Sequence, residues 1–279
     1  MQSEWNAQVR QGQRFAFGEN WNRFLLQLTD AHIVAAGDSL KGLLGLADLT
    51  GMRFLDAGSG SGLFSLAARQ LGAHVVSFDY DPQSVACTRH LRERYSANDP
   101  DWAVHEGSAL DPAFLGGLGD FDIVYSWGVL HHTGHMWDAV DALSHSVGPG
   151  GLYALALYNT QPVFTPVWKG IKRIYCGAPA PGKFAIAGAW AVLCAARGLA
   201  ADLLRLRNPL MRYRASATLR GMSFWRDVVD WVGGHPFETA TPDEVVQFLN
   251  VRGFARVALR TVGRRLGCNE FVFRREEKP

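Results

Sequence analysis

A glycine-rich segment between a predicted strand and a predicted helix constrains the fold of this chain most. Residues 54–64 read FLDAGSGSGLF, with Gly58, Gly60 and Gly62 at alternate positions. Glycines without Cβ atoms let a ligand approach the backbone closely. The free amide groups at the start of the following helix point toward such a ligand. The segment therefore predicts a strand–turn–helix unit that holds a nucleotide-like cofactor.

Carboxylates end two of the predicted strands. Asp56 comes immediately before the glycines, where it can accept a hydrogen bond from a cationic ligand group. Asp79 follows the second predicted strand, residues 74–78, and is placed to accept the hydroxyl groups of a ribose. Asp81 precedes Pro82, a pattern typical of a helix N-cap with proline at the first helical position. Asp79 is therefore the predicted ribose ligand and Asp81 a structural residue.

The spacing of the glycines separates two classes of cofactor. Dinucleotide-binding folds use G-x-G-x-x-G, with the pyrophosphate at the helix N-terminus. Here the third glycine comes one residue early, and a carboxylate before the turn would repel a pyrophosphate. S-adenosylmethionine carries an ammonium, a sulfonium and a ribose but no phosphate. On residues 54–64 and 75–79, the chain resembles the class I S-adenosylmethionine-dependent methyltransferases.

Three more segments carry the same resemblance. Residues 106–111, 121–132 and 147–153 are similar to the exit of that family's third strand, to its fourth strand with the following turn, and to the turn into its fifth strand. The nearest likeness is to the small-molecule branch that includes the ubiquinone-biosynthesis O-methyltransferases. The resemblance implies an α/β, Rossmann-like sheet of seven strands, one of them antiparallel. It also implies that the residues binding S-adenosylmethionine are Asp56, Gly58, Gly60, Gly62, Asp79, Tyr80, Ser108, Ala109 and Trp127.

Composition agrees with a folded enzyme. Hydrophobic residues make up 48% of the 279 residues, which is enough to bury a substantial core. The four cysteines have no paired spacing, which favours reduced thiols and a cytoplasmic location over a disulfide framework. The first residues lack the pattern of a signal peptide.

The pattern along the chain predicts three parts. We expect an N-terminal helical cap over residues 1–50, a cofactor-binding core over 51–159 and 238–279, and a helical insertion over 160–237. Residues 14–24 either pack on the sheet or fold over the cofactor, and the two interpretations are compatible. Apolar residues at helical spacing over 136–147 predict a helix on the sheet.

Two signals define the C-terminal part of the core. Thr241-Pro242-Asp243-Glu244 predicts a capping box that opens a helix ending at Gly253. Residues 254–262 and 268–274 predict a terminal pair of strands.

The insertion holds most of the positive charge. Residues 160–237 contain eleven Lys and Arg and three Asp, a net charge of +8, whereas the whole chain carries +2. The insertion begins at the carboxyl end of a strand, where substrate-facing loops leave an α/β sheet. We expect it to cover the substrate site, and its charge suggests an acceptor with a phosphate or carboxylate group.

Residues 184–196 form an uncharged stretch between Lys183 and Arg197. Thirteen residues are too few to span a bilayer, which needs about twenty. The stretch is therefore either a buried helix or dimer contact, or an apolar surface that approaches a membrane or a lipid-linked substrate. The basic run over 205–220 is either a binding surface or a solvated face. Binding of nucleic acid is disfavoured because few aromatic residues are interleaved with the arginines.

Methyl transfer to a hydroxyl or ammonium group requires a base, and histidine suits neutral pH. His131 and His132 follow the fourth predicted strand, and we expect His131 rather than His132 to face the acceptor. Either histidine could instead only support the turn. Tyr158 and Asn159, at the end of the fifth strand, are candidate substrate contacts. A metal site at these histidines is disfavoured because Gly134 interrupts the spacing that a metal pair would need.

Transfer of a methyl group to an O or N atom of a small, anionic or lipid-linked acceptor is therefore the leading prediction. The alternatives are a nicotinamide-dependent oxidoreductase, an RNA-directed methyltransferase, and a degenerate fold that only binds a ligand. The presence of Asp56, the three glycines and Asp79 argues against the last.

Overall fold

The computed structural model describes residues 2–205 and 224–277. It has a single seven-stranded sheet with the strand order β3-β2-β1-β4-β5-β7-β6. Strands β1 to β5 run parallel, and β7 pairs antiparallel with both β5 and β6. The seven strands are β1 (Arg53–Ala57), β2 (His74–Asp79), β3 (Trp102–Glu106), β4 (Phe121–Trp127), β5 (Val147–Tyr158), β6 (Phe254–Arg260) and β7 (Cys268–Arg275). The prediction of an α/β sheet with one antiparallel strand is confirmed.

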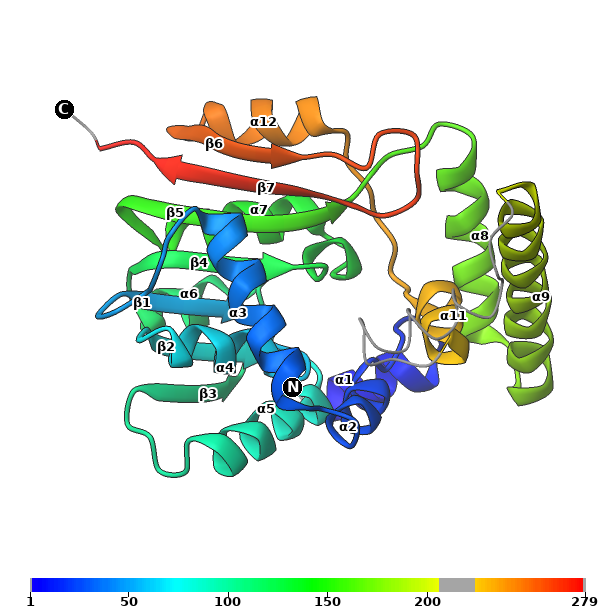
Figure 1. The fold of residues 1–279 in the computed structure, drawn as a ribbon, viewed down its shortest axis with the longest axis horizontal. Coiled ribbons are helices and arrows are strands. Elements are labelled where there is room, and N and C mark those ends of the chain that lie inside the picture. Colours follow the sequence, from blue (N-terminus) through cyan, green and yellow to red (C-terminus); the bar gives the residue numbers. More distant parts are fainter. Residues whose placement is uncertain (1, 206–223, 278–279) are drawn as a thin grey trace.

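Helices cover both faces of the sheet (Figure 1). One face packs against α3 (Asp30–Leu44), α4 (Leu63–Gln70) and α5 (Pro82–Tyr95). The other packs against α6 (Pro112–Leu118), α7 (Met136–His145) and α12 (Pro242–Asn250). Because both faces are buried, the central strands are almost continuously apolar, as in β5.

Local capping signals set the helix starts as predicted. The Asp81 carboxylate accepts a hydrogen bond from the Gln83 amide, with Pro82 in the first turn of α5. Thr241 and Glu244 form the capping box of α12 through two side chain–backbone hydrogen bonds. The helix ends at Asn250, earlier than the expected stop at Gly253.

The N-terminal part contains α1 (Gln2–Arg10) and α2 (Gly18–Leu25) in addition to α3. The segment between β5 and α12 contains α8 (Phe164–Gly177), α9 (Ala180–Leu204) and α11 (Phe224–Gly233). These three helices share a separate apolar cluster that includes Trp168, Ala187 and Val232. They lie at one end of the sheet, next to α1 and α2 (Figure 1).

Helix α9 is longer than the uncharged stretch suggested. It has 25 residues and includes both Lys183 and Arg197, the two charged residues that border the thirteen-residue stretch in the sequence. By length and composition, α9 could cross a membrane, and 11% of its most apolar part is buried within the protein. Most of the basic run over 205–220 lies outside the described residues.

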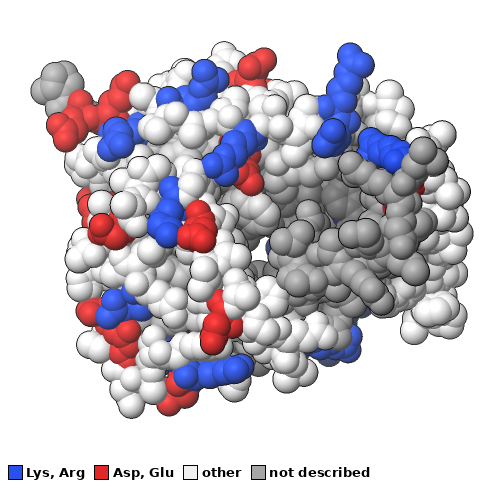
Figure 2. Space-filling model, in the orientation of Figure 1, with Lys and Arg blue, Asp and Glu red and all other residues white. Residues whose placement is uncertain are grey.

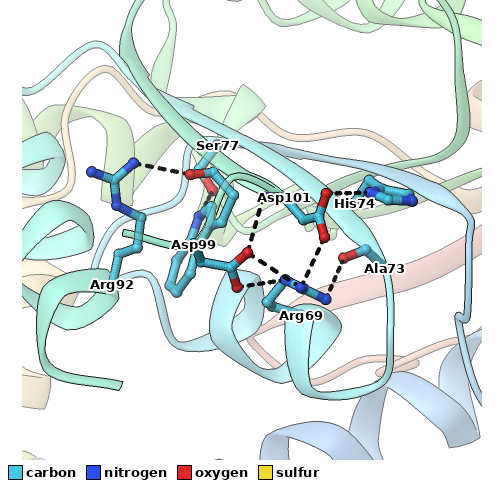
Figure 3. Close-up of polar contacts among 8 residues, drawn as sticks. Arg69, Ala73, His74, Ser77, Arg92, Asp99 and Asp101 are labelled. Carbon is cyan, nitrogen blue, oxygen red and sulfur yellow. Dashed lines mark hydrogen bonds and ion pairs between the residues drawn. The ribbon is translucent and has the colours of Figure 1, made fainter. Parts of the chain in front are cut away.

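A polar cluster fixes the edge of the sheet at β3 (Figure 3). The Arg69 guanidinium on α4 donates to Asp99 at 2.7 Å and to Asp101 at 3.1 Å, and Asp101 also contacts His74 at 2.9 Å. Arg69 holds the pKa of Asp99 below its ordinary value. The cluster therefore joins α4, β2 and the loop that leads into β3.

Arg69→Ala is expected to lower the free energy of unfolding by about 1–3 kcal/mol, because two partly buried carboxylates lose their shared donor. Since the pKa of Asp99 is lowered, this contribution is present above the ordinary value of 3.8 and is lost as the pH falls further. Urea unfolding at neutral and acidic pH measures it. Arg256→Ala, at an exposed site on β6, is the control. Equal effects of the two variants would show that the cluster contributes nothing.

Candidate active site

A cavity of about 810 Å³ opens at the carboxyl ends of β1, β2, β3 and β4. The glycine turn forms its floor, and Arg14, Phe15, Phe17, Trp21 and Phe24 cover it from the N-terminal side. Parallel strands place their carboxyl ends at one edge, so residues from four distant segments meet there. All of the predicted cofactor residues line this cavity except Gly62.

Gly62 is the N-cap of α4 and has a positive φ of 81°. Its amide donates to the Ser59 carbonyl within the turn, and a Cβ atom there would lie 2.9 Å from the Thr88 Cα. Its glycine is therefore required for packing between the turn and α5. Gly62 thus has a packing role, and its contact with the cofactor stays a prediction.

Gly58 and Gly60 are needed for close approach within the cavity wall. A Cβ atom on Gly58 would lie 2.3 Å from Val129 Cγ1, and one on Gly60 would lie 3.0 Å from the Trp21 indole nitrogen. Both residues also have positive φ angles, 85° and 54°. The turn thus packs against the segment that follows β4 on one side and against α2 on the other.

Asp79 is held in place by backbone amides. One carboxylate oxygen accepts from the Gly60 amide at 2.9 Å, and the other accepts from the Asp81 amide at 2.9 Å. Each oxygen keeps a lone pair for a ligand in the cavity that Asp79 lines. Burial raises the pKa of Asp79 to about 7, with these two amides acting in the opposite direction.

Asp56 lies deeper, at the end of β1. It accepts a hydrogen bond of 2.5 Å from the Ser65 hydroxyl on α4, and burial raises its pKa to about 6. Two carboxylates with raised pKa values in one cavity favour a ligand that carries positive charge and hydroxyl donors. The two carboxylates therefore fit S-adenosylmethionine and do not suit a pyrophosphate.

The N-terminal helices are fastened over the cavity through Arg14. Its guanidinium donates to the carbonyls of His132 at 2.9 Å and Thr133 at 3.3 Å. It also lies over the rings of Trp5 and Tyr80, at 5.6 and 5.1 Å from their centroids. Residues 14–24 thus both pack on the core and cover the cavity.

His132 is the histidine of the predicted pair that lines the cavity. Its Nδ1 lies 2.7 Å from the Pro236 carbonyl oxygen. Because a carbonyl can only accept, Nδ1 carries the proton and Nε2 of the neutral ring keeps its lone pair. Burial and the nearby Lys172 charge lower the pKa of His132 to about 3, so the ring stays neutral at physiological pH.

His131 takes a different position and corrects our preference for it. The side chain is fully buried, does not line the cavity, and its Nδ1 accepts a hydrogen bond from the Tyr158 amide. Its ring packs 4.0 Å from the Tyr158 ring, centroid to centroid. Both histidines lie in the short 3-10 helix η1 (Leu130–His132), where successive side chains point about 120° apart. Only one of them can face the cavity.

Tyr158 and Asn159, the predicted substrate contacts, also lie outside the cavity lining. The Tyr158 ring packs against His131, Trp231 and Phe237. The Asn159 side chain donates to the Gly263 carbonyl and accepts from Asn269. Both residues join β5 to the neighbouring segments rather than contacting the acceptor space.

Lys172 is a feature that the sequence did not reveal. Its side chain on α8 is fully buried among the rings of Trp168, Trp231, Tyr158 and Phe237. The ammonium donates to the Trp231 carbonyl, and burial lowers its pKa to about 7. A basic residue within an apolar helix pattern, between Trp168 and Tyr175, was the only signal in the sequence.

No group of three or more His, Cys, Asp or Glu within residues 2–205 and 224–277 is arranged to hold a metal ion.

Residues 55–153 match the family described as a methyltransferase domain. Among curated proteins, the chain is similar to the ubiquinone biosynthesis O-methyltransferase of Xylella fastidiosa (strain 9a5c), with 31% identity over 42% of this chain and 46% of the relative. It is also similar to that of Methylocella silvestris, with 32% identity over 47% of this chain and 50% of the relative. The chain thus matches about half the length of these curated relatives.

Two solved structures have a similar fold. Magnesium protoporphyrin IX methyltransferase from Synechocystis PCC 6803, with bound S-adenosylhomocysteine, aligns with a TM-score of 0.54 and 16% identity over 92% of this chain and 94% of that one. An O-methyltransferase family protein from Burkholderia thailandensis aligns with a TM-score of 0.54 and 12% identity over 90% of this chain and 59% of that one. At these identities the likeness concerns the fold.

The affinity for S-adenosylhomocysteine is expected to rise between about pH 6 and pH 8. Hydroxyl donors of the ligand favour the ionised form of Asp79, so binding lowers a pKa of about 7 and releases a proton. Calorimetry in buffers with different heats of ionisation measures that release. Asp79→Asn should weaken binding at least about tenfold and reduce the proton release, because a charge-assisted hydrogen bond is lost. Asp138→Asn, at an exposed site on α7, is the control, and an unchanged affinity in Asp79→Asn would place the ribose elsewhere.

Lys172→Met is expected to raise the free energy of unfolding, relative to that of the unaltered protein, by more at pH 6 than at pH 10. The pKa of Lys172 is depressed in the folded protein, so the unfolded state binds more protons between about pH 7 and 10.5, and the lysine destabilises the fold as the pH falls through that range. Urea unfolding of both proteins at the two pH values tests this. A difference that is the same at both pH values would contradict a buried, partly neutral lysine.

Proposed function

We propose that this chain, which carries a class I S-adenosylmethionine-dependent methyltransferase domain, methylates a hydroxyl oxygen of a small, apolar acceptor. The family match over residues 55–153 and the seven-stranded sheet confirm the prediction of this domain and of S-adenosylmethionine as its cofactor. The nicotinamide alternative has no support from the site, where two buried carboxylates flank the glycine turn.

The position of His132 supports the choice of a hydroxyl acceptor. S-adenosylmethionine, when bound, supplies an activated methyl group. The chain itself must orient the acceptor and take its proton as the oxygen is alkylated. His132 offers a neutral ring whose protonated Nδ1 is fixed by the Pro236 carbonyl, which leaves Nε2 as the basic atom.

The low pKa of His132 is compatible with this role. The hydroxyl proton becomes acidic only as the methyl group bonds to the oxygen, so a neutral imidazole suffices as the acceptor of that proton. A neutral His132 can accept a proton throughout the physiological pH range. A pH profile set by protonation of His132 should therefore have no acidic limb near pH 6.

Aromatic side chains favour a flat, apolar acceptor. Phe17, Phe64, Tyr125 and Trp127 line the cavity, and Trp127 is 43% exposed. The Phe64 ring lies 6.4 Å from the Trp127 ring, and the Phe17 ring lies 4.9 Å from His132. Such rings stack on planar substrates and exclude water from the reacting oxygen. The O-methyltransferase names of the relatives point to the same class of reaction.

An uncharged acceptor suits the cavity better than the anionic one suggested by composition. Among the described residues that line the cavity, Arg14 is the one lysine or arginine, and its guanidinium is already bonded to two backbone carbonyls. The acidic residues of this described lining are Glu4, Asp56, Asp79, Asp81 and Asp111. Lys169, Arg173 and Arg197, the exposed basic residues of α8 and α9, are not part of it.

His132→Ala is expected to lower kcat by about 10²–10⁴-fold, the range that a general base contributes, with little change in the affinity for S-adenosylhomocysteine. Transfer of a labelled methyl group to a panel of phenols with apolar substituents measures the activity. His135→Ala, at a neighbouring and exposed cavity residue, is the control and should retain activity.

The two histidines can be separated by a second readout. His131→Ala should lower the melting temperature, because it removes a fully buried side chain from the contact with Tyr158. His132→Asn can still donate to the Pro236 carbonyl, so it should fold normally while lacking the base. Full activity in His132→Asn, or loss of chemistry in a folded His131 variant, would refute the assignment.

A further inference from the structure

Helix α9 is apolar on both its inward and outward sides. Its inward side packs against α8 and α11, with Ala187 and Gly198 buried and the Trp190 ring 4.5 Å from Trp168. An ordinary surface helix would present polar residues to the solvent on the opposite side. Here the outward side consists of Ala185, Ala189, Val192, Leu193, Ala196, Leu199, Ala200, Leu203 and Leu204, all of which are exposed.

These outward residues form a continuous face. They recur at three- and four-residue intervals along the helix, and Val192, Leu193 and Leu204 are 68%, 55% and 86% exposed. Val163, just before α8, and Ile174 on α8 are also apolar and exposed, at 71% and 66%. An exposed apolar face of this size is typical of a contact surface rather than of a solvated one.

The exposed charges of α9 itself have one sign. Arg197 on α9 is exposed, and Arg205 follows α9 directly. Asp202 is the only acidic residue in α8 and α9, both fully described, and it is buried. By contrast, positive and negative side chains are interspersed over the core, on the left of Figure 2.

We propose that the outward face of α9 lies on the surface of an anionic lipid bilayer, with its apolar side chains in the interface and the side chains of Arg197 and Arg205 on the headgroups. Apolar side chains framed by basic residues are the pattern of an in-plane membrane helix. Long basic side chains can extend from an apolar face to the charged headgroups. The packing of α9 on α8 and α11 is retained, so the helix lies along the surface rather than across the bilayer.

A second copy of the chain fits this face less well. A symmetric dimer places the same patch of both copies in contact. Arg197 of both copies would then lie in one contact patch, with no exposed acidic residue on α9 to offset the two charges. Anionic headgroups supply the opposite charge, which makes the bilayer the complementary partner.

Vesicle flotation of the full chain tests this inference without any assay of activity. Vesicles of phosphatidylcholine alone are compared with vesicles that also contain phosphatidylglycerol as the minor component. Binding is expected only with phosphatidylglycerol, and it should weaken as salt screens charges beyond about 10 Å at 0.1 M. The double variant Val192→Asp/Leu193→Asp should lower the bound fraction at least about tenfold, because it places two carboxylates in the interface.

Matched variants separate the apolar and the charged contributions. Val34→Asp, at a 63% exposed site on α3, changes an exposed valine away from this face and should bind vesicles like the unaltered protein. Arg197→Glu, at an exposed site on α9, should weaken binding to the vesicles that contain phosphatidylglycerol. Calorimetric binding of S-adenosylhomocysteine, unchanged in all variants, shows that each one is folded.

Three results would overturn the proposal. The first is the absence of binding to either vesicle. The second is a dimer in sedimentation that Val192→Asp/Leu193→Asp converts to a monomer, which would make the face an interface between copies. The third is binding that resists salt and needs no anionic lipid, which would indicate insertion of α9 across the bilayer. The outcome does not depend on the methyl acceptor, so a failure of the proposed function leaves it unaffected.

Discussion

The pairing of the glycine turn with Asp79 is the interaction on which the site depends. The amides of Gly58 and Ser59 both donate to the Phe78 carbonyl, and the Gly60 amide donates to the Asp79 carboxylate. The end of β1 and the end of β2 are thereby fixed to each other before any ligand is present. This arrangement satisfies the backbone groups of the turn and still leaves carboxylate lone pairs facing the cavity. Because the turn is already ordered, binding of a ligand carries little free-energy cost for ordering the loop.

Polar contacts connect the N-terminal cap to the insertion near that turn. The Asn20 side chain on α2 donates to the Asp230 carboxylate on α11, and the Phe15 amide donates to the His235 carbonyl. The same region supplies the Pro236 carbonyl that orients His132. The N-terminal cap and the insertion are therefore connected both to each other and to the proposed base. A displacement of α11 would therefore shift the Pro236 carbonyl and change the orientation of the His132 ring.

Much of the fold followed from local signals, and the arrangement of the site did not. The glycine spacing, Asp79 and the N-cap at Asp81 could be read from the sequence because each depends on residues close along the chain. The choice between His131 and His132 could not, since two adjacent residues in a 3-10 turn face different directions and the rotation of that turn depends on Pro236 and Tyr158. The surroundings of Tyr158 could not be predicted for a similar reason: whether the end of a strand is open depends on distant segments, and here the rings of Phe237 and Trp231 pack against Tyr158.

The basic residues of the insertion take different positions, which its composition does not reveal. Lys172 is buried in an aromatic cage, while Lys169 and Arg173, on the same helix, are exposed and are not among the described residues that line the cavity. Basic residues that do not line the cavity cannot select the acceptor by direct contact. Basic residues near the apolar face of α9 can still govern where the enzyme meets an apolar acceptor, because such a molecule is concentrated in lipid rather than in water. The two proposals made above, an apolar acceptor and a membrane contact of α9, therefore fit each other: an acceptor of that kind would be drawn from a membrane surface.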